Sequence, residues 1–453
     1  MNPPPGATVP RDASPSLDPI PPRPRPALPV AVVTVPATPL AGRSQVAALA
    51  PVLGRSPVQR HLHHLGTLGV SQAVLVLDAA LDSSATERTL REQFEELSPA
   101  VRTRLEMRVV SDTGHGEWAD LTGGADCLVI QGDTIHDPRC YPLLLSGDGD
   151  TVLVDGADAT STGQKGGKGG VPVGMMLRET LHSGSLDSEL AEPRRVDIRT
   201  VPEYLPDLRR HLPLTWTPIR SVADQRQASR HLFDAAQKGV LDFPARYLHP
   251  LPENALVRLL ADTPVTPNAV TILTGVLGFT ATYLFATGQR GAVGAALAIA
   301  LVVNVLDGVD GKLARVRLQA SRFGDRLDHL LDVTFEFSWY LALGWGLRAT
   351  GAEGNPLAVG VGLIGVMLAS RALSGVYKAF SGRQIHDHRA FDRGFRLVAG
   401  RRNIYVLVLV AGWLMGRLDQ ALLLSLWWGG VTATVYLMRS AMAWQASRRS
   451  PAA

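Results

Sequence analysis

The sequence predicts a multi-domain chain: an N-terminal α/β domain followed by a C-terminal all-α domain of six transmembrane helices. Three observations support this. Residues 30–210 carry mixed charges, whereas residues 269–445 are dominated by Leu, Val, Ala, Gly and Trp. In the first half, β-rich runs alternate with helical patterns, which is typical of α/β domains. In the second half, six apolar segments follow one another, and long apolar segments are typical of membrane spans.

The composition excludes several classes of protein. Hydrophobic residues make up 46% of the chain and charged residues 19%, which argues against a fully soluble protein. The net charge of +4 is too small to indicate a nucleic-acid partner. Two cysteines, Cys127 and Cys140, do not indicate a disulfide framework. Residues 1–28 hold ten prolines and no basic region followed by an apolar stretch, so we expect a disordered tail without a signal peptide.

The N-terminal domain is expected over residues 29–212, with five strands and two helices. The strands are Val30–Val35, Ala73–Leu77, Leu105–Val110, Cys127–Gln131 and Thr151–Val154, and the helices are Pro57–Leu68 and Ser84–Leu97. This alternation predicts a parallel sheet. Residues 163–170 are rich in Gly and Lys and are expected to form a flexible loop.

A linker is expected over residues 213–268. It should contain a helix at Ala228–Lys238 and an amphipathic helix at Pro252–Ala261 that lies in the membrane interface. The membrane domain is expected over residues 269–445, with a short tail at 446–453. Its six segments are Ala269–Ala286, Ala292–Leu306, Leu330–Leu347, Leu357–Val376, Ile404–Met415 and Ala421–Met442.

Basic residues gather in alternate loops of the membrane domain. The loops that would share one side with both termini are rich in Arg and Lys, whereas the other loops carry one arginine each, namely Arg290, Arg348 and Arg417. Basic loops are retained on the cytoplasmic side of a membrane. The sequence therefore predicts an integral protein of the cell membrane (plasma or inner) with cytoplasmic termini.

Four aspartates stand out in the apolar half. Asp307 and Asp310 are three residues apart, and Asp328 and Asp332 are four apart, so each pair shares one face of a helix. Carboxylates are costly near a membrane and usually functional, and their hard oxygens suit Mg²⁺ or Mn²⁺. A solvated run of charges is the alternative, but it would need neither the two glycines nor the fixed gaps of this segment.

These aspartates belong to a run that resembles the signature of the CDP-alcohol phosphotransferase (CDP-alcohol phosphatidyltransferase) family, D-x2-D-G-x2-A-R-x8-G-x3-D-x3-D. The eight fixed positions all match, at Asp307, Asp310, Gly311, Ala314, Arg315, Gly324, Asp328 and Asp332. The resemblance implies a membrane transferase that moves a phospho-alcohol group from a CDP-alcohol to a hydroxyl acceptor and releases CMP. It further implies a place in phospholipid or inositol-phosphate-type headgroup synthesis, and a homodimer.

The same resemblance implies a role for each signature residue. Two Mg²⁺ or Mn²⁺ ions would be held by Asp307, Asp310, Asp328 and Asp332. Asp332 would also take the proton of the acceptor hydroxyl. The CDP donor would be bound by Asp307, Gly311, Ala314, Arg315 and Gly324. Gly324 is also expected to permit the turn between the second and third membrane helices.

Two further segments bear on the substrates. Thr266-Pro267-Asn268-Ala-Val-Thr271 resembles the T-P-N-x-x-T start of the first membrane helix in the same family, and residues 238–268 resemble its bifunctional inositol-phosphate cytidylyltransferase/phosphotransferase branch. Arg401 and Arg402, in a basic loop, are candidate ligands of an anionic acceptor such as inositol phosphate or glycerol phosphate. Alternatively, this loop only follows the charge rule or binds anionic lipid heads.

The N-terminal half resembles Rossmann-like sugar-nucleotide nucleotidyltransferases in two segments, Pro51-Val-Leu-Gly54-Arg55-Ser-Pro57-Val58 and Leu128-Val-Ile-Gln-Gly132-Asp133. The second segment resembles the strand of that family that ends in a metal-binding aspartate. The loop that should be rich in glycine lacks most of its glycines, so backbone amides are not expected to cradle a triphosphate. We therefore expect a degenerate, noncatalytic domain. If it is catalytic, Arg43 and Asp133 would act on nucleotide.

Other interpretations stay open. The N-terminal domain of a bifunctional enzyme would make the CDP-alcohol from CTP before the membrane domain uses it. A noncatalytic scaffold or transporter would use the aspartates only to bind cations. His61, His63 and His64 fall in an amphipathic helix without a matching ligand cluster, and we expect them to be solvated or packed rather than metal-bound.

Overall fold

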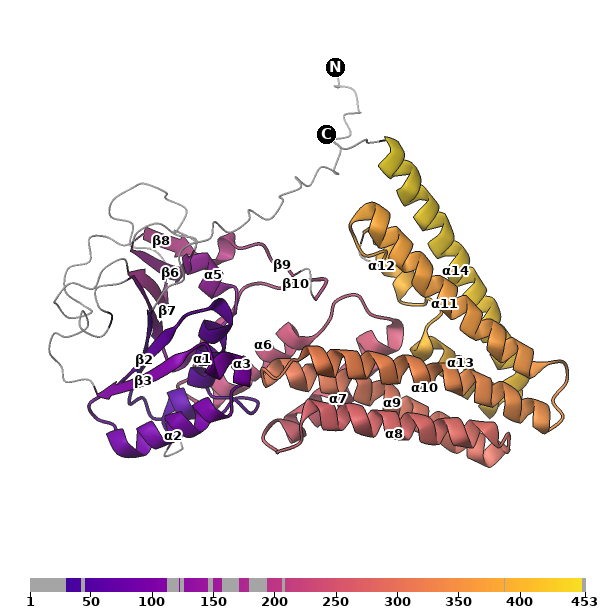
Figure 1. Ribbon diagram of the computed structural model, residues 1–453, viewed down its shortest axis with the longest axis horizontal. Helices are drawn as coiled ribbons and strands as arrows, with labels where there is room; N and C mark the ends of the chain where they lie inside the picture. Colours follow the sequence, from indigo (N-terminus) through magenta and orange to yellow (C-terminus); the bar gives the residue numbers. More distant parts are fainter. Residues whose placement is uncertain are drawn as a thin grey trace, which may run out of the picture.

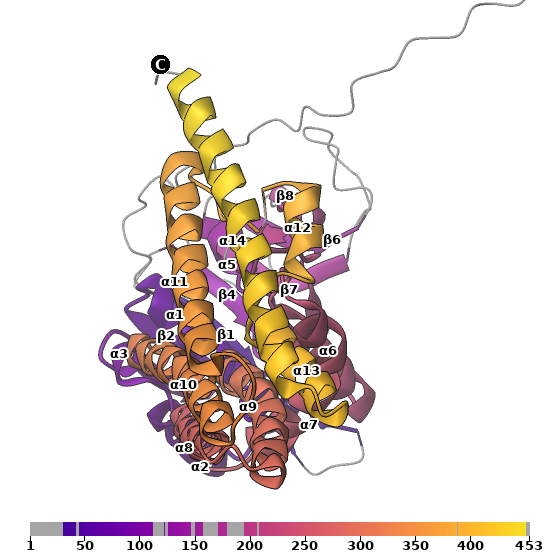
Figure 2. The same ribbon diagram turned by 90° about the vertical axis from the view of Figure 1, so that its right-hand side faces the viewer.

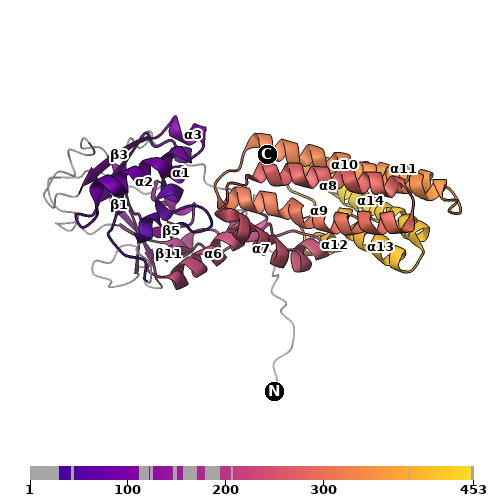
Figure 3. The same ribbon diagram turned by 90° about the horizontal axis from the view of Figure 1, so that it is seen from below.

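The computed structural model describes residues 30–41, 45–111, 122, 126–145, 150–156, 171–178, 194–205, 208–386 and 388–449. An α/β domain lies at one end of the molecule and a set of long helices at the other, with α6 (Val222–Ala236) and α7 (Pro250–Ala261) between them (Figure 1, Figure 3). The expected tail, the loop at 163–170 and Arg43 lie outside the described residues.

The α/β domain is built on a seven-stranded sheet of order β3-β2-β1-β4-β7-β6-β8. Its strands are β1 (Val30–Val35), β2 (Gln72–Leu77), β3 (Glu106–Ser111), β4 (Cys127–Gln131), β6 (Thr151–Asp155), β7 (Val171–Arg178) and β8 (Arg194–Asp197). The first four are mutually parallel, as predicted. β7, however, runs antiparallel to both β4 and β6. The expectation of a parallel sheet was therefore wrong for this half, because β7 was not recognised and pairs antiparallel with both of its neighbours.

Shorter elements add to the described part of the domain. They are η1 (Ala47–Leu49), α1 (Pro57–Leu68), α2 (Ser83–Glu95), α3 (Pro99–Arg102), β5 (Thr134–His136), α5 (Cys140–Leu145), η2 (Ile198–Thr200), β9 (Tyr204–Leu205), β10 (Arg210–His211) and β11 (Trp216–Pro218). α1 begins where Ser56 forms a capping box with Gln59 and ends at Gly69, which has φ +84°. β11 pairs with β5, so the α/β domain continues past residue 212, the end expected from the sequence.

Several histidines of the α/β domain pack against one another and against Tyr141. His61 Nδ1 lies 2.7 Å from the Tyr141 hydroxyl, and the rings of His61 and His136 are 5.3 Å apart. His136 Nε2 lies 2.6 Å from the Val173 carbonyl oxygen. Burial, above all, lowers the pKa of His136 to about 4 and that of His64 to about 3. These rings are therefore packed as neutral groups, which fits the structural role expected for the helix at 57–68.

Seven further helices form the second unit: α8 (Pro267–Ala286), α9 (Arg290–Val316), α10 (Arg322–Ala349), α11 (Pro356–Ser381), α12 (Ala390–Arg396), α13 (Arg402–Leu414) and α14 (Leu418–Arg449). α8, α9 and α10 pack together, and α11 and α14 run along each other (Figure 1, Figure 2). η3 (Pro244–Leu248) precedes α7, which packs on α9. The six expected membrane segments fall on α8, α9, α10, α11, α13 and α14.

Within the described residues, four of these helices are long and apolar enough to cross a membrane: α8, α9, α11 and α14. α13 has thirteen residues and spans about 20 Å at 1.5 Å per residue, which is short for a hydrocarbon core of about 30 Å. α10 is long, but Asp325, Asp328 and Asp332 lie in its first half, and Glu336 follows one turn later. The structure thus supports an integral membrane protein. α10 carries too many acidic residues, and α13 is too short, to be simple membrane-spanning helices.

We predict that acid destabilises the α/β domain through its buried histidines. An unfolded histidine has a pKa of about 6.5, whereas His136 has a pKa of about 4 when folded. Below pH 6.5 the unfolded chain takes up the proton that the folded one rejects, so stability is lost as the pH falls toward 4. At pH 5 this single group accounts for about 2 kcal/mol.

His136→Gln keeps a donor for the Val173 carbonyl and removes this titration. Hydrogen exchange at β1 in the full chain, measured at pH 7.5 and 5.0, should therefore show a smaller loss of opening free energy in the variant. His211→Gln, at an exposed position, serves as the control. The same pH dependence in wild type and His136→Gln would contradict the assignment.

Candidate active site

A cavity of about 580 Å³ opens among α7, α8, α9, α10 and the start of α13. Two of the helices that line it, α8 and α10, begin with side-chain caps. The Thr266 side chain accepts from the Ala269 amide at the start of α8, with Pro267 in the first turn. Ser321 accepts from the Gly324 amide in the same way at the start of α10. The T-P-N string is therefore the N-terminus of a helix that faces the cavity.

Three carboxylates from two helices meet in this cavity. Asp307 of α9 and Asp328 and Asp332 of α10 each offer an oxygen, and these oxygens lie within 4.8 Å of one another. Arg402, at the first position of α13, bridges two of them: Nη2 is 2.9 Å from Asp307 Oδ2 and Nη1 is 2.8 Å from Asp332 Oδ1. Clustered carboxylates need a cation nearby, and three oxygen ligands at this separation suit a divalent metal ion.

Asp310 lies one turn along α9 and is held differently. Its Oδ2 accepts a hydrogen bond from the Thr271 hydroxyl at 2.6 Å, and its Oδ1 accepts from the Gly311 amide. Thr271 comes from α8, so this bond ties the first membrane helix to the second. As arranged here, Asp310 lines the same cavity but stands outside the group of three.

Small residues bring the surrounding helices close. A Cβ on Gly324 would lie 2.7 Å from Asn268 Oδ1, so α10 meets the first turn of α8 there. Gly324 is helical, and the residue with positive φ in the α9–α10 turn is Leu318, at φ 57°. The expectation that Gly324 permits this turn was therefore wrong: glycine is needed there for close helix packing.

α7 closes one wall of the cavity through a buried ion pair. Lys312 Nζ lies 2.7 Å from Glu253 Oε2 and donates to Asn254 Oδ1 at 2.9 Å. Gly308 leaves room for this pair, because a Cβ there would overlap the Glu253 carboxylate. Burial raises the pKa of Glu253 and Lys312 opposes that shift. The linker helix thus packs against α9 beside Asp307 through polar contacts.

Cations line the remaining walls. Arg315 Nε donates to the Ala236 carbonyl at 2.8 Å, which fixes this arginine on the cavity. Burial, followed by the nearby Arg315 and Arg209, lowers the pKa of Lys238. On the other side, Arg396 is 6% exposed, and its Nε and Nη1 have no hydrogen-bond partner among the described residues.

Charge accumulates around Arg396. Burial first, and then Arg401, lower its pKa to about 9. Burial also lowers the pKa of His386 to about 2, with Arg396, Arg401 and Arg209 adding to the shift. A buried cation beside other cations is unfavourable unless an anion offsets them. This end of the cavity is therefore suited to a negatively charged group.

Comparison with known proteins agrees with this geometry. Residues 264–435 match the CDP-alcohol phosphatidyltransferase family. The inner membrane protein YnjF of Escherichia coli is 30% identical over 173 residues, which cover 36% of this chain and 79% of that protein.

The chain belongs to the CDP-alcohol phosphatidyltransferase family.

Other members resemble it over part of their length. A bifunctional IPC transferase and DIPP synthase of Aquifex aeolicus is 27% identical over 233 residues, 50% of this chain and 49% of that protein. The corresponding protein of Rubrobacter xylanophilus is 29% identical over 210 residues, 46% of this chain and 44% of that one. The chain thus spans about half the length of these curated relatives.

Two solved structures are similar to part of the chain. Mycobacterium tuberculosis phosphatidylinositol phosphate synthase with CDP-DAG bound is 19% identical, covers 43% of this chain and 94% of its own, and has a TM-score of 0.33. HddC from Yersinia pseudotuberculosis is 12% identical, covers 44% of this chain and 98% of its own, and has a TM-score of 0.30.

The eight signature residues and both candidate acceptor residues, Arg401 and Arg402, line the same cavity. Asp133 lies elsewhere, in the α/β domain, and is 2% exposed. Sequence reasoning had flagged Thr271 only within the T-P-N-x-x-T string. Lys238 begins the stretch 238–268 that resembles the bifunctional branch, and Arg396 belongs to the same basic loop as Arg401 and Arg402, but the sequence did not single out either residue. Glu253 was missed, because nothing in its local sequence distinguishes it from other charged residues.

Proposed function

We propose that this protein is an integral membrane CDP-alcohol phosphotransferase that transfers a phospho-alcohol group from a CDP-alcohol to a hydroxyl acceptor and releases CMP. The observation that carries the proposal is the meeting of Asp307, Asp328 and Asp332 in a cavity lined by the whole family signature. Exposed apolar residues on the same helices support the membrane setting, among them Ile272, Tyr283, Trp345, Leu424 and Trp427.

The donor set fits divalent metal ions, so we propose that Asp307, Asp310, Asp328 and Asp332 hold two of them, Mg²⁺ or Mn²⁺. When bound, such ions would neutralise the pyrophosphate and the charge that develops on the leaving CMP. Asp310 is oriented for this by Thr271. Arg402 balances part of the carboxylate charge in the structure described.

The chain's own residues would perform the other tasks. Gly311 and Ala314 would let cytidine approach α9 closely, and Gly324 lines the donor side of the cavity at the start of α10, where it packs against Asn268. Arg315, anchored on the Ala236 carbonyl, binds the donor phosphates. The acceptor oxygen forms a bond to the attacked phosphorus, the bond from that phosphorus to the CMP oxygen breaks, and the acceptor proton passes to the Asp332 carboxylate.

We further propose that the acceptor carries an anionic group, such as the phosphate of a phosphorylated polyol. The support is Arg396, whose buried Nε and Nη1 lack partners among the described residues, together with its neighbours Arg401 and His386. This chemistry fits inositol phosphate or glycerol phosphate, and hence headgroup synthesis. Asp307, Asp328 and Asp332 are called the acid cluster below. Because Arg402 contacts two of these aspartates, we assign it to the acid cluster as well as to the acceptor site.

The finer assignments belong to the same proposal. The basic loops support a cell-membrane location with the cavity and both termini on the cytoplasmic side. The family resemblance supports a homodimer. The buried Asp133 supports a noncatalytic α/β domain, since a metal-binding carboxylate must be accessible to its nucleotide.

Asp328→Asn should lower CMP release at least about 100-fold while leaving the fold intact, because the amide removes one ligand charge. Full-length protein in nanodiscs is incubated with Mg²⁺, a panel of CDP-alcohols and acceptors, and the products are identified by mass spectrometry. Glu353→Gln, exposed in the loop between α10 and α11, is the matched control.

Equal CMP release by wild type and Asp328→Asn, or none by wild type with any donor, would contradict the transferase assignment and favour a cation-binding scaffold. The same preparation given CTP and alcohol phosphates should release no pyrophosphate. If it does, the α/β domain is catalytic and the protein is bifunctional.

Arg396→Gln should raise KM for a phosphorylated acceptor about 10- to 100-fold, the range expected for losing a charge-assisted hydrogen bond. KM for the CDP-alcohol should stay near its wild-type value. Arg393→Gln, exposed on the same helix, is the control. An unchanged acceptor KM in Arg396→Gln would place the acceptor elsewhere.

A further inference from the structure

We propose that the α/β domain positions the active site: it holds the turn between the two aspartate-bearing helices, α9 and α10. The contact is made by a hairpin of four residues, Val52–Arg55, together with Arg60 of α1. The effect of this contact on catalysis rests on the proposed function. The contact itself is independent of that function. It gives the domain a task that requires no nucleotide chemistry.

The hairpin reaches from the α/β domain into the linker and the helices. The Val52 amide donates to the Arg55 carbonyl at 2.9 Å, and the two residues between have positive φ, 54° for Leu53 and 78° for Gly54. Positive φ at both central residues matches a tight two-residue turn. Leucine is unfavourable in this conformation and keeps it only where its surroundings hold it.

The surroundings of Leu53 are apolar side chains of the linker and membrane helices. Leu53 is 8% exposed and belongs to one buried cluster with residues of four helices, α6, α7, α8 and α9. The other members are Phe233, Ala236, Val257, Ala261, Val270, Leu306, Val309, Leu313 and Val316. Leu53 is therefore the α/β domain's own contribution to a core shared with α9.

Gly54 lets the hairpin approach α7 closely. A Cβ at this position would overlap the carbonyl oxygen of Ala261, the last residue of α7. Backbone atoms cannot move aside as the end of a long side chain can. Glycine is thus required here by both its positive φ and the contact, and a larger residue would push the two units apart.

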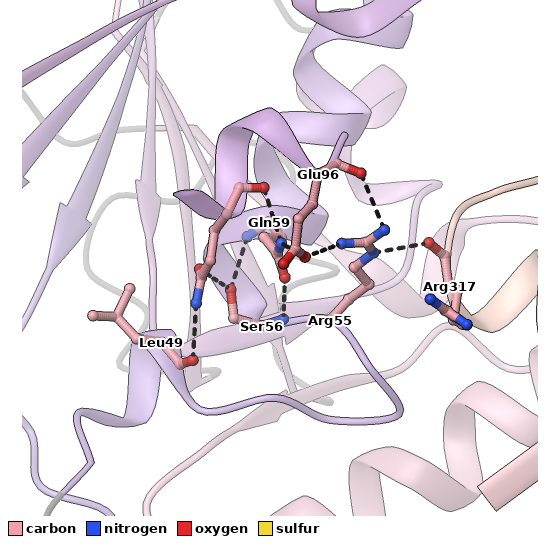
Figure 4. A network of polar contacts seen from close by, with 7 residues as sticks. Leu49, Arg55, Ser56, Gln59, Glu96 and Arg317 are labelled. Carbon is pink, nitrogen blue, oxygen red and sulfur yellow. Dashed lines mark hydrogen bonds and ion pairs between the residues drawn. The ribbon is translucent and has the colours of Figure 1, made fainter. Parts of the chain in front are cut away.

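Two arginines then cap the end of α9. Arg60 Nη1 donates to the Val316 carbonyl at 2.9 Å. Arg55 Nε donates to the Arg317 carbonyl at 3.1 Å (Figure 4). The last carbonyls of a helix have no partner within it, and cations near them are favourable. The Gln319 amide already bonds the Ala314 carbonyl, so the arginines satisfy acceptors that the helix leaves open.

Arg55 is itself held in place by the α/β domain. Its Nη1 lies 2.6 Å from Glu96 Oε2 and its Nη2 donates to the Glu96 carbonyl at 3.1 Å. Gln59 Nε2 donates to the same carboxylate at 3.0 Å, and Ser56 caps the helix that carries Gln59 (Figure 4). Arg60 Nη2 bonds the Val52 carbonyl, which ties it to the hairpin. Contacts within the α/β domain therefore hold both guanidinium groups in the positions from which they bind α9.

The capped turn separates the two halves of the signature. Arg315 comes one residue before Val316, and Ser321, the N-cap of α10, follows four residues after Arg317. A shift of this turn would change the placement of α10, and with it Asp328 and Asp332, relative to Asp307. Arg55, Arg60 and Gly54 are accordingly positioning residues for the acid cluster.

The test compares two glycine substitutions in the full chain. Gly54 and Gly69 both have positive φ, +78° and +84°, but a Cβ on Gly69 would meet nothing within 4 Å. Gly54→Ala and Gly69→Ala therefore carry a similar backbone penalty and differ in the contact with α7. Hydrogen exchange at the amides of Leu318 and Gln319 reports the turn, and CMP release reports catalysis.

We expect Gly54→Ala to speed exchange at these amides at least about 10-fold and to lower kcat more than it changes KM for the CDP-alcohol. Gly69→Ala should do neither. Wild-type exchange in Gly54→Ala would overturn the contact, and faster exchange with unchanged kcat would overturn the positioning role. If wild type releases no CMP at all, the proposed function fails, but the exchange comparison still decides the contact.

If Gly54→Ala does not fold, the double variant Arg55→Met with Arg60→Met takes its place, because it keeps the hairpin and removes only the caps. It should show the same faster exchange at Leu318 and Gln319. Arg102→Met, which removes the Arg102–Glu95 ion pair elsewhere in the domain, is its control. Native exchange in the double variant would refute the capping role.

Discussion

The arrangement of the membrane domain depends on three carboxylates that must share one small volume. Asp307, Asp328 and Asp332 repel one another, and burying such a group without a cation is unfavourable. Arg402 bonds two of them and lies at the start of α13. One guanidinium thus ties α9, α10 and α13 together, and a metal site would use the same negative potential.

Close helix packing sets the distance between these carboxylates. A Cβ on Gly278 of α8 would lie 2.7 Å from the Phe335 ring of α10, and the indole of Trp339 donates to the Gly278 carbonyl at 2.7 Å. Between membrane helices, small residues and such hydrogen bonds replace the hydrophobic effect as the source of specific contact. Thr271 adds a bond from α8 to Asp310. The acid cluster is therefore supported by one helix that carries none of its members.

Local patterns predicted most elements because each was a strong local signal. Val30–Val35, Pro57–Leu68 and Cys127–Gln131 were predicted to the residue. β7 was not predicted, because its pairing with β4 and β6 depends on residues far apart in the sequence. The eight signature residues could be predicted to lie together because helical periodicity places them on one face of each of two successive helices. Those two helices, α9 and α10, line one cavity. Arg396 and the Arg55–Arg317 contact come from tertiary packing and have no local pattern.

Direct binding of Mn²⁺ to the full chain tests the central claim, that these carboxylates form a metal site. The bound fraction can be measured from the electron paramagnetic resonance signal of free Mn²⁺ in detergent solution. We expect wild type to bind Mn²⁺ and the double variant Asp307→Asn with Asp328→Asn to lose that binding while its helices stay folded. Equal binding by both proteins would contradict this account of the site.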